Sequence, residues 1–245
     1  MATPSFVTGS GWFGIGSAAF NCTVTGPNVY LIVGVASSNG GVTAVTYGGQ
    51  AMTKIGNYAP YGELSFWYLR NPPSGSNNIV QTGSVDGAIH ALVYQGIRLA
   101  SPFDAIGSAN SASSTTTPSV TVGSQGGSLV ISGSYHEQRA GANLSPLDGQ
   151  TERVETAATG GTGNWGFMTG DEQGAASVVT GSWGTPAAAH VATIATNAHG
   201  VPSGSQIVFI VFIAARRWQE FLKDLKRGLV PPNQLRRRYQ ELVTI

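Results

Sequence analysis

Short apolar runs, separated by glycine- and proline-rich turns, recur along most of the 245-residue chain. Residues 29–36 are apolar throughout, which indicates a strand that is buried on both faces. Residues 42–47 and 50–55 flank Gly48-Gly49, where positive φ angles allow a tight hairpin. Further strands are predicted at residues 63–70, 77–82, 88–95, 119–122, 128–136, 150–155, 165–169 and 175–183. The pattern predicts an all-β fold.

The most apolar stretch is residues 207–215, Ile-Val-Phe-Ile-Val-Phe-Ile-Ala-Ala, in which most residues are β-branched or aromatic. Nine residues are too few to cross a bilayer as a helix. A run without polar positions fits a strand that is packed on both faces. We therefore expect it to be the last central strand of a two-sheet antiparallel β-sandwich that spans residues 1–215.

After residue 215 the period becomes helical. The apolar positions are Trp218, Phe221, Leu222 and Leu225 in a first helix, and Leu235, Tyr239 and Leu242 in a second. Both sets follow the spacing of one helix face, and Pro231-Pro232 separates them. We expect a short C-terminal helical tail over residues 216–245. Because helices this short are unstable alone in water, each apolar face must be covered by the sandwich, by the other helix or by a second chain.

The charge of the chain is concentrated in this tail. Residues 216–245 contain eight Lys/Arg and three Asp/Glu, a net charge of +5, whereas the remainder contains five and nine, a net charge of −4. Arg236, Arg237 and Arg238 could contact nucleic-acid phosphates, but no other feature favours nucleic acid. A membrane-surface helix would need more bulky apolar area and no Pro-Pro break. Docking on an acidic protein surface explains both the apolar positions and the charges, and packing on its own sandwich stays the simplest alternative.

The sequence offers little catalytic chemistry. Two G-x-G-x-x-G matches, at residues 9–14 and 161–166, do not open a helix in a βαβ unit, and no Walker A or G-x-S-x-G motif occurs. The four histidines lack metal-site spacing, and His90, inside an apolar strand, is expected to be a hydrogen-bonded core or interface residue. Asp171 is expected in a solvated loop rather than at a Ca²⁺ site. We predict no catalytic residue, cofactor or metal.

Two further observations concern the compartment and a second kind of ligand. Cys22 is the single cysteine, so no intrachain disulfide can form, and no signal peptide is recognised, which predicts synthesis in the cytoplasm. Trp12, Tyr61 and Trp165 lie in loop-like or uncertain segments and could stack on sugar rings. Loop packing or a subunit contact explains these aromatic residues more simply.

Three segments carry a family resemblance. They are residues 45–55 (Val-Thr-Tyr-Gly-Gly-Gln-Ala-Met-Thr-Lys-Ile), 64–75 (Leu-Ser-Phe-Trp-Tyr-Leu-Arg-Asn-Pro-Pro-Ser-Gly) and 91–97 (Ala-Leu-Val-Tyr-Gln-Gly-Ile). They resemble a jelly-roll or concanavalin-like β-sandwich module found in bacteriophage virion proteins and bacterial surface proteins. The resemblance spans residues 29–106 and continues more weakly through 127–153 and 174–183. It implies a fold and no activity.

These observations predict a non-enzymatic virion structural protein, decoration-like and associated with a capsid or tail. The expected partners are other virion proteins and further copies of the chain, bound through the apolar positions and the three arginines of the tail. The alternative is a carbohydrate-binding module with its site at Trp12, Tyr61 and Trp165. A polysaccharide hydrolase is a third possibility, which would need two carboxylates at a set separation.

Overall fold

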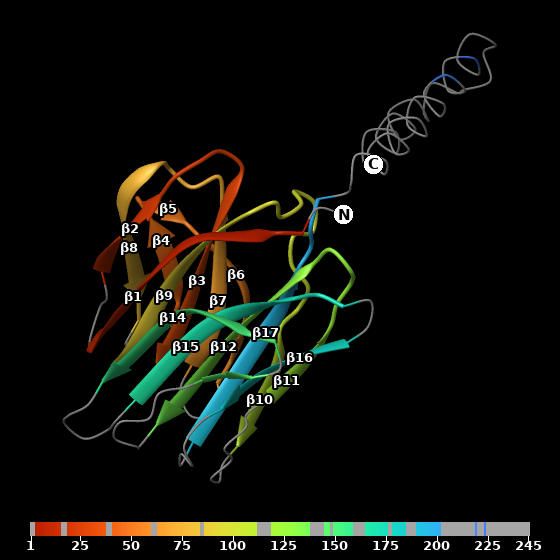
Figure 1. Ribbon diagram of the computed structural model, residues 1–245. Helices are drawn as coiled ribbons and strands as arrows, with labels where there is room; N and C mark the ends of the chain where they lie inside the picture. Colours follow the sequence, from red (N-terminus) through yellow and green to blue (C-terminus); the bar gives the residue numbers. More distant parts are fainter. Residues whose placement is uncertain are drawn as a thin grey trace, which may run out of the picture. The chain divides into compact units, whose positions relative to one another are not determined.

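The computed structural model describes most of the chain before residue 202. The described residues are 3–15, 19–37, 41–59, 63–83, 86–111, 119–137, 145–147, 149–158, 165–175, 178–184, 190–201, Gln219 and Lys223. Up to residue 201, the regular structure within these ranges is β-strand, and the named strands pair antiparallel (Figure 1). The all-β prediction is confirmed for this part. Gln219 and Lys223 are helical, and the rest of the predicted tail lies outside the described residues.

The first nine strands form two sheets. They are β1 (Ser5–Ile15), β2 (Ala19–Val24), β3 (Val29–Ser37), β4 (Ala44–Tyr47), β5 (Gln50–Ala51), β6 (Thr53–Tyr58), β7 (Glu63–Arg70), β8 (Gly75–Thr82) and β9 (Asp86–Gln95). Inner sheet 1 has the order β1-β9-β3-β7-β6, and outer sheet 1 has the order β2-β8-β4-β5. We call β1–β9 repeat 1.

The next eight strands form a second pair of sheets. They are β10 (Gly107–Ser111), β11 (Ser119–Gly123), β12 (Leu129–Glu137), β13 (Ser145–Leu147), β14 (Thr151–Ala158), β15 (Trp165–Gln173), β16 (Val178–Gly184) and β17 (His190–Ala198). Inner sheet 2 has the order β10-β17-β12-β15-β14, and outer sheet 2 has the order β11-β16-β13. We call β10–β17 repeat 2. Its strand order is that of repeat 1, with only the two-residue β5 lacking a described equivalent.

The two repeats agree in register as well as in strand order. Gly34 of β3 and Gly133 of β12 hold the same place in the pairing with their two neighbouring strands. A bulge interrupts the last strand of each inner sheet at the same point, at Ile55 in β6 and at Arg153 in β14. The register therefore gives residues of repeat 1 a counterpart in repeat 2. A bulge changes the direction of the side chains that follow it, so a bulge at the same point in β6 and β14 is a specific similarity between the two repeats.

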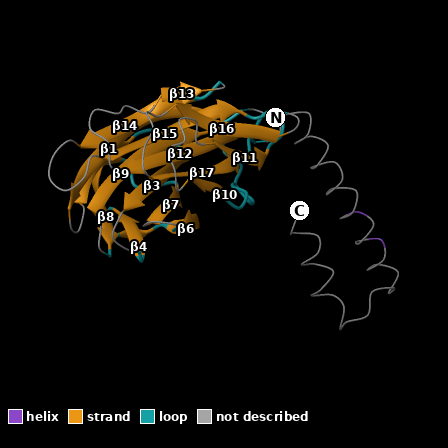
Figure 2. Ribbon diagram, turned by 90° about the horizontal axis from the view of Figure 1, so that it is seen from below, coloured by secondary structure: helices purple, strands orange, loops and turns teal. Residues whose placement is uncertain are grey.

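Apolar clusters show how the sheets are layered. One cluster joins outer sheet 1 to inner sheet 1, a second joins the two inner sheets, and a third joins inner sheet 2 to outer sheet 2. The same succession is visible in Figure 1, where the labels run from β2, β8 and β4 through β9 and β12 to β16 and β11, and Figure 2 shows the strands from another side. Every residue of β3 is buried, as its uninterrupted apolar sequence predicts, because β3 lies at the centre of inner sheet 1 with a sheet on each face.

The inner sheets face each other with approximate two-fold symmetry. β9 contacts β14 and β15, and the equivalent strand β17 contacts β6 and β7. A Cβ atom on Gly9 would lie 2.7 Å from Val154, and one on Gly56 would lie 2.8 Å from Ile106. The counterpart of Gly9 is Ile106 and that of Val154 is Gly56, so a small residue meets a large one at both ends with the roles exchanged. Such reciprocal contacts are typical of an isologous interface.

One expectation is revised by this topology. The sequence analysis predicted one two-sheet arrangement over residues 1–215, whereas the described strands form four sheets. The reason is that β9 and β17 each return to lie beside the strand that opened their own set, so the first pair of sheets is complete before residue 107. Residues 207–215 lie outside the described residues. Their predicted place as a last central strand stays a prediction.

We predict that the close approach at Gly56 limits the size of the residue there. Replacing Gly56 by Ala should lower the free energy of unfolding by about 1–3 kcal/mol, since a methyl group must displace Ile106. The double variant Gly56→Ala/Ile106→Ala should lose less than the sum of the two single variants. Gly123→Ala is the control, because nothing lies within 4 Å of its Cβ position. Denaturant unfolding measures the four variants against the wild type, and additive losses would show that the contact is not tight.

Candidate functional site: the polar half of the interface between the repeats

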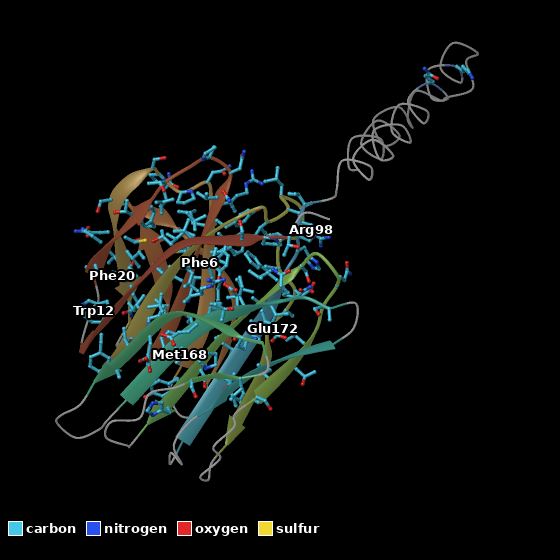
Figure 3. All side chains as sticks on the ribbon, viewed as in Figure 1. Phe6, Trp12, Phe20, Arg98, Met168 and Glu172 are labelled. Atoms are coloured by element: carbon cyan, nitrogen blue, oxygen red, sulfur yellow. The ribbon has the colours of Figure 1, made fainter. Side chains whose placement is uncertain are left out.

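The residues predicted to bind a partner or a glycan are not brought together in the described part of the chain. The predicted tail residues lie outside the described residues, as does Tyr61. Trp12 is partly buried on β1 and packs against the apolar cluster of repeat 1 (Figure 3). Trp165 opens β15 in the other inner sheet, and only its backbone is described. Trp12 and Trp165 therefore do not share a sheet, and Trp12 has a packing role.

A group of buried ionisable residues instead lies between the two inner sheets. His90 of β9 is fully buried, with Nδ1 at 3.0 Å from Thr169 Oγ1 and Nε2 at 2.9 Å from Thr156 Oγ1. Its ring stacks on Phe167 at a centroid distance of 4.3 Å. Burial lowers the pKa of His90 from 6.5 to about 3, since a charged imidazole would lose its hydration there. His90 is thus a neutral imidazole that links the repeats, which confirms the predicted core or interface role.

A charged group lies farther along the same strands. Arg153 makes a bidentate ion pair with Asp171, with Nε–Oδ2 at 2.6 Å and Nη2–Oδ1 at 2.9 Å. The hydroxyl of Tyr94, from repeat 1, donates to Asp171 Oδ2 at 2.8 Å. Burial, together with the negative charge of Asp171, raises the pKa of Tyr94 well above 10. Tyr94 therefore stays protonated and serves as a hydrogen-bond donor between the repeats.

Asp171 corrects the sequence analysis, which placed it in a solvated loop. It belongs to β15 and its side chain is only 4% exposed. Phe6 of β1 covers the group: the guanidinium carbon of Arg153 lies 4.6 Å from the Phe6 ring centroid, and Phe6 meets Tyr94 edge-to-face at 5.6 Å. Arg153, Asp171 and Tyr94 are too far apart in sequence for spacing to reveal them, and Asp171 lies just beyond the strand that was predicted at residues 165–169.

A second group fastens the connection between the repeats. Asp104 accepts hydrogen bonds from Asn197 Nδ2 at its Oδ2 and pairs with His199 Nε2 at its Oδ1, both at 2.9 Å. Burial alone would raise the pKa of Asp104, but these hydrogen bonds and the positive charge of Arg98 together lower it. Backbone bonds from Asp104 to Asn197 and from His199 to Pro102 add to the attachment. The group holds residues 98–104 on the end of β17.

Polar side chains also occupy the space between the two sheets of repeat 2. Ser132 donates to Gln150 Oε1 and Gln150 Nε2 donates to Glu172 Oε2, both at 2.6 Å, while the hydroxyls of Ser134 and Thr193 lie 3.0 Å apart. The counterparts of Ser132, Gln150, Ser134 and Thr193 in repeat 1 are Val33, Met52, Val35 and Ile89, all in its apolar cluster or buried beside it. These hydrogen bonds join side chains on or next to the strands of inner sheet 2. The face that inner sheet 2 turns toward outer sheet 2 is therefore partly polar, where the same face of inner sheet 1 is apolar.

The chemistry of these groups is structural. Hydrogen bonds or ion pairs within the fold engage both ring nitrogens of His90 and both carboxylate oxygens of Asp171 and Asp104. Within the described ranges, no three His, Cys, Asp or Glu residues gather in a way that could hold a metal ion. The same ranges hold no helix with the length and apolar character needed to cross a membrane.

Comparisons of the chain with protein-family models, with curated proteins and with solved structures give no match. The site must therefore be interpreted from its own geometry.

We predict that His90 makes the stability of the protein depend on pH. The unfolded chain binds a proton at this histidine near pH 6.5 and the folded protein only near pH 3. Because the unfolded state binds more protons between these values, stability falls as the pH decreases below 6.5, by about 2 kcal/mol at about pH 5. In His90→Gln this contribution should disappear, so the difference between the two proteins, measured by denaturant unfolding from about pH 7.5 to pH 5, should change with pH. A constant difference would contradict the assignment.

Proposed function

We propose that the protein is a non-enzymatic virion structural protein, decoration-like and associated with a capsid or tail, that assembles through its C-terminal tail. In this proposal the two repeats are tandem jelly-roll-like sandwiches and form the displayed body. The observation that carries it is the use of the buried polar groups: His90, Tyr94, Asp171 and Arg153 connect one repeat to the other. Such links suit a rigid module that keeps its shape on a particle.

The tail supplies the assembly surface in this proposal. Its apolar residues follow the spacing of one helix face. Its net charge is +5, whereas the rest of the chain has a net charge of −4. The compact unit Ala2–Val201 contains both repeats and is separate from the unit that contains residues 202–245. A tail that belongs to another unit suits docking onto neighbouring virion proteins or onto further copies of the chain, with Trp218, Phe221, Leu222 and Leu225 as the apolar anchors.

We predict that deleting residues 216–245 leaves the body folded and abolishes assembly. The unfolding transition of the truncated protein should match that of the full chain, because the tail belongs to a separate unit. Light scattering should show loss of the oligomer, and incorporation into particles should fail. Replacing Arg236, Arg237 and Arg238 by Gln is a milder variant, which should weaken assembly mainly at low salt. An unchanged oligomer, or unchanged incorporation of the truncated protein, would refute the role of the tail.

The alternative function is glycan binding through Trp12, Tyr61 and Trp165. Only Trp12 has a described side chain, and its packing against the apolar cluster of repeat 1 leaves less of the ring for a sugar. We therefore predict no selective binding on a glycan array. Strong selective binding that is lost in Trp12→Ala or Trp165→Ala, with the unfolding transition retained, would favour the carbohydrate-binding module over the virion protein.

A further inference from the structure

The approximate two-fold axis divides the interface between the inner sheets into two chemically different halves. The axis lies near Gly34 and its counterpart Gly133. A Cβ on Gly34 would lie 3.3 Å from Thr169, and one on Gly133 would lie 3.3 Å from Phe66, the counterpart of Thr169. If the two repeats had the same side chains, the two halves of this interface would be identical. In this protein one half is polar and the other is not.

The polar half contains three hydrogen bonds that cross from one repeat to the other. His90 of repeat 1 bonds to Thr156 and Thr169 of repeat 2, and Tyr94 of repeat 1 donates to Asp171 of repeat 2. All of these side chains except Thr156 are buried, and Arg153 completes the charge of the group. Each partner supplies what the other lacks: repeat 1 brings an imidazole and a phenol, and repeat 2 brings two hydroxyls and a carboxylate.

The other half is built from the counterparts of these residues and is apolar or aromatic. His90 corresponds to Ile194, Tyr94 to Ala198, Thr169 to Phe66, Thr156 to Tyr58 and Asp171 to Tyr68. Ile194, Ala198 and Phe66 are buried in the cluster that joins the inner sheets. Tyr68 contacts Phe103 at a centroid distance of 5.0 Å. Both halves of the interface are built from strands with the same order and register. The two halves therefore differ in their side chains.

The difference penalises pairing between identical repeats. If two inner sheets of repeat 1 faced each other with this geometry, each His90 would meet the ring of Phe66 in place of the Thr169 hydroxyl, and each Tyr94 would meet Tyr68 in place of a carboxylate. If two inner sheets of repeat 2 did so, Thr169 would meet Ile194 and Asp171 would lose the phenol. The first pairing removes the hydroxyl that bonds to His90 Nδ1, and the second removes the phenol that donates to Asp171. Such losses at buried polar groups are much more costly than replacing one apolar contact by another.

We infer that inner sheet 1 is a binding surface specific for inner sheet 2, and that the polar half excludes pairing between identical inner sheets. The partner is inner sheet 2 of the same chain or, if two copies of the chain exchange repeats, inner sheet 2 of the other copy. Contacts between copies made through these sheets therefore join unlike repeats. The inference depends on the described interface alone and not on the proposed virion role.

The test is a refolding experiment on the full chain. The protein is unfolded in denaturant at high concentration and diluted, so that inner sheets can pair within or between chains, and the species are separated by size and weighed by native mass spectrometry. The wild type should return to its starting distribution. The variant His90→Leu/Tyr94→Phe/Thr156→Val/Thr169→Val keeps bulk but removes the crossing hydrogen bonds. In this variant, the fraction of interchain species that are not in the starting distribution should be at least tenfold higher than in the refolded wild type.

A matched control tests whether the polar groups are the cause. Ile194→Val/Tyr68→Phe changes two counterparts in the apolar half and should keep the wild-type distribution. An unchanged distribution in the fourfold variant, or an equal rise in the control, would overturn the inference. Tyr94→Phe guards against a fourfold variant that fails to refold, because it removes one oxygen and retains the ring. It should show a smaller rise in the same direction, and no rise would also count against the inference.

Discussion

The structure depends on the burial of two β-sheets against each other across an approximate two-fold axis. Glycines allow this approach: Gly34 and Gly133 lie near the axis, and Gly9 and Gly56 receive Val154 and Ile106 at the two ends. Because the interiors of proteins are packed at crystal-like density, a methyl group at any of these positions would have to displace a neighbour. The same contact makes β3 a strand with every residue buried, since both faces of inner sheet 1 are covered.

The polar groups follow from this arrangement. A buried hydrogen-bonding group without a partner is costly, so each one between the inner sheets restricts which surface can lie opposite. His90 satisfies both ring nitrogens with hydroxyls of repeat 2, and the Asp171 carboxylate satisfies Arg153 and Tyr94 together. These contacts add modest net stability but strong selectivity. A separate group, Asp104 with Asn197 and His199, holds the connecting segment on β17.

The two repeats have also diverged within their own interiors. Repeat 1 packs its inner and outer sheets through apolar side chains, which include Val33, Val35 and Met52. At the counterparts, repeat 2 has Ser132, Ser134 and Gln150. Ser132 donates to Gln150, Gln150 donates to Glu172, and Ser134 bonds to Thr193. One strand order thus tolerates two kinds of interior, provided that the polar groups of the second find partners.

The sequence by itself determined the secondary structure class and most strand positions, because apolar runs and Gly-Pro turns are local signals. It also indicated that His90, inside an apolar strand, would be a hydrogen-bonded core or interface residue. It did not reveal the repeated strand order, since counterparts such as Val33 and Ser132 share a place in the register and not a side chain. Only the tertiary structure decided the partners of the buried polar groups. The hydrogen bonds of His90 and Tyr94 join residues 66 to 79 positions apart, a separation at which no spacing rule of strands or helices applies.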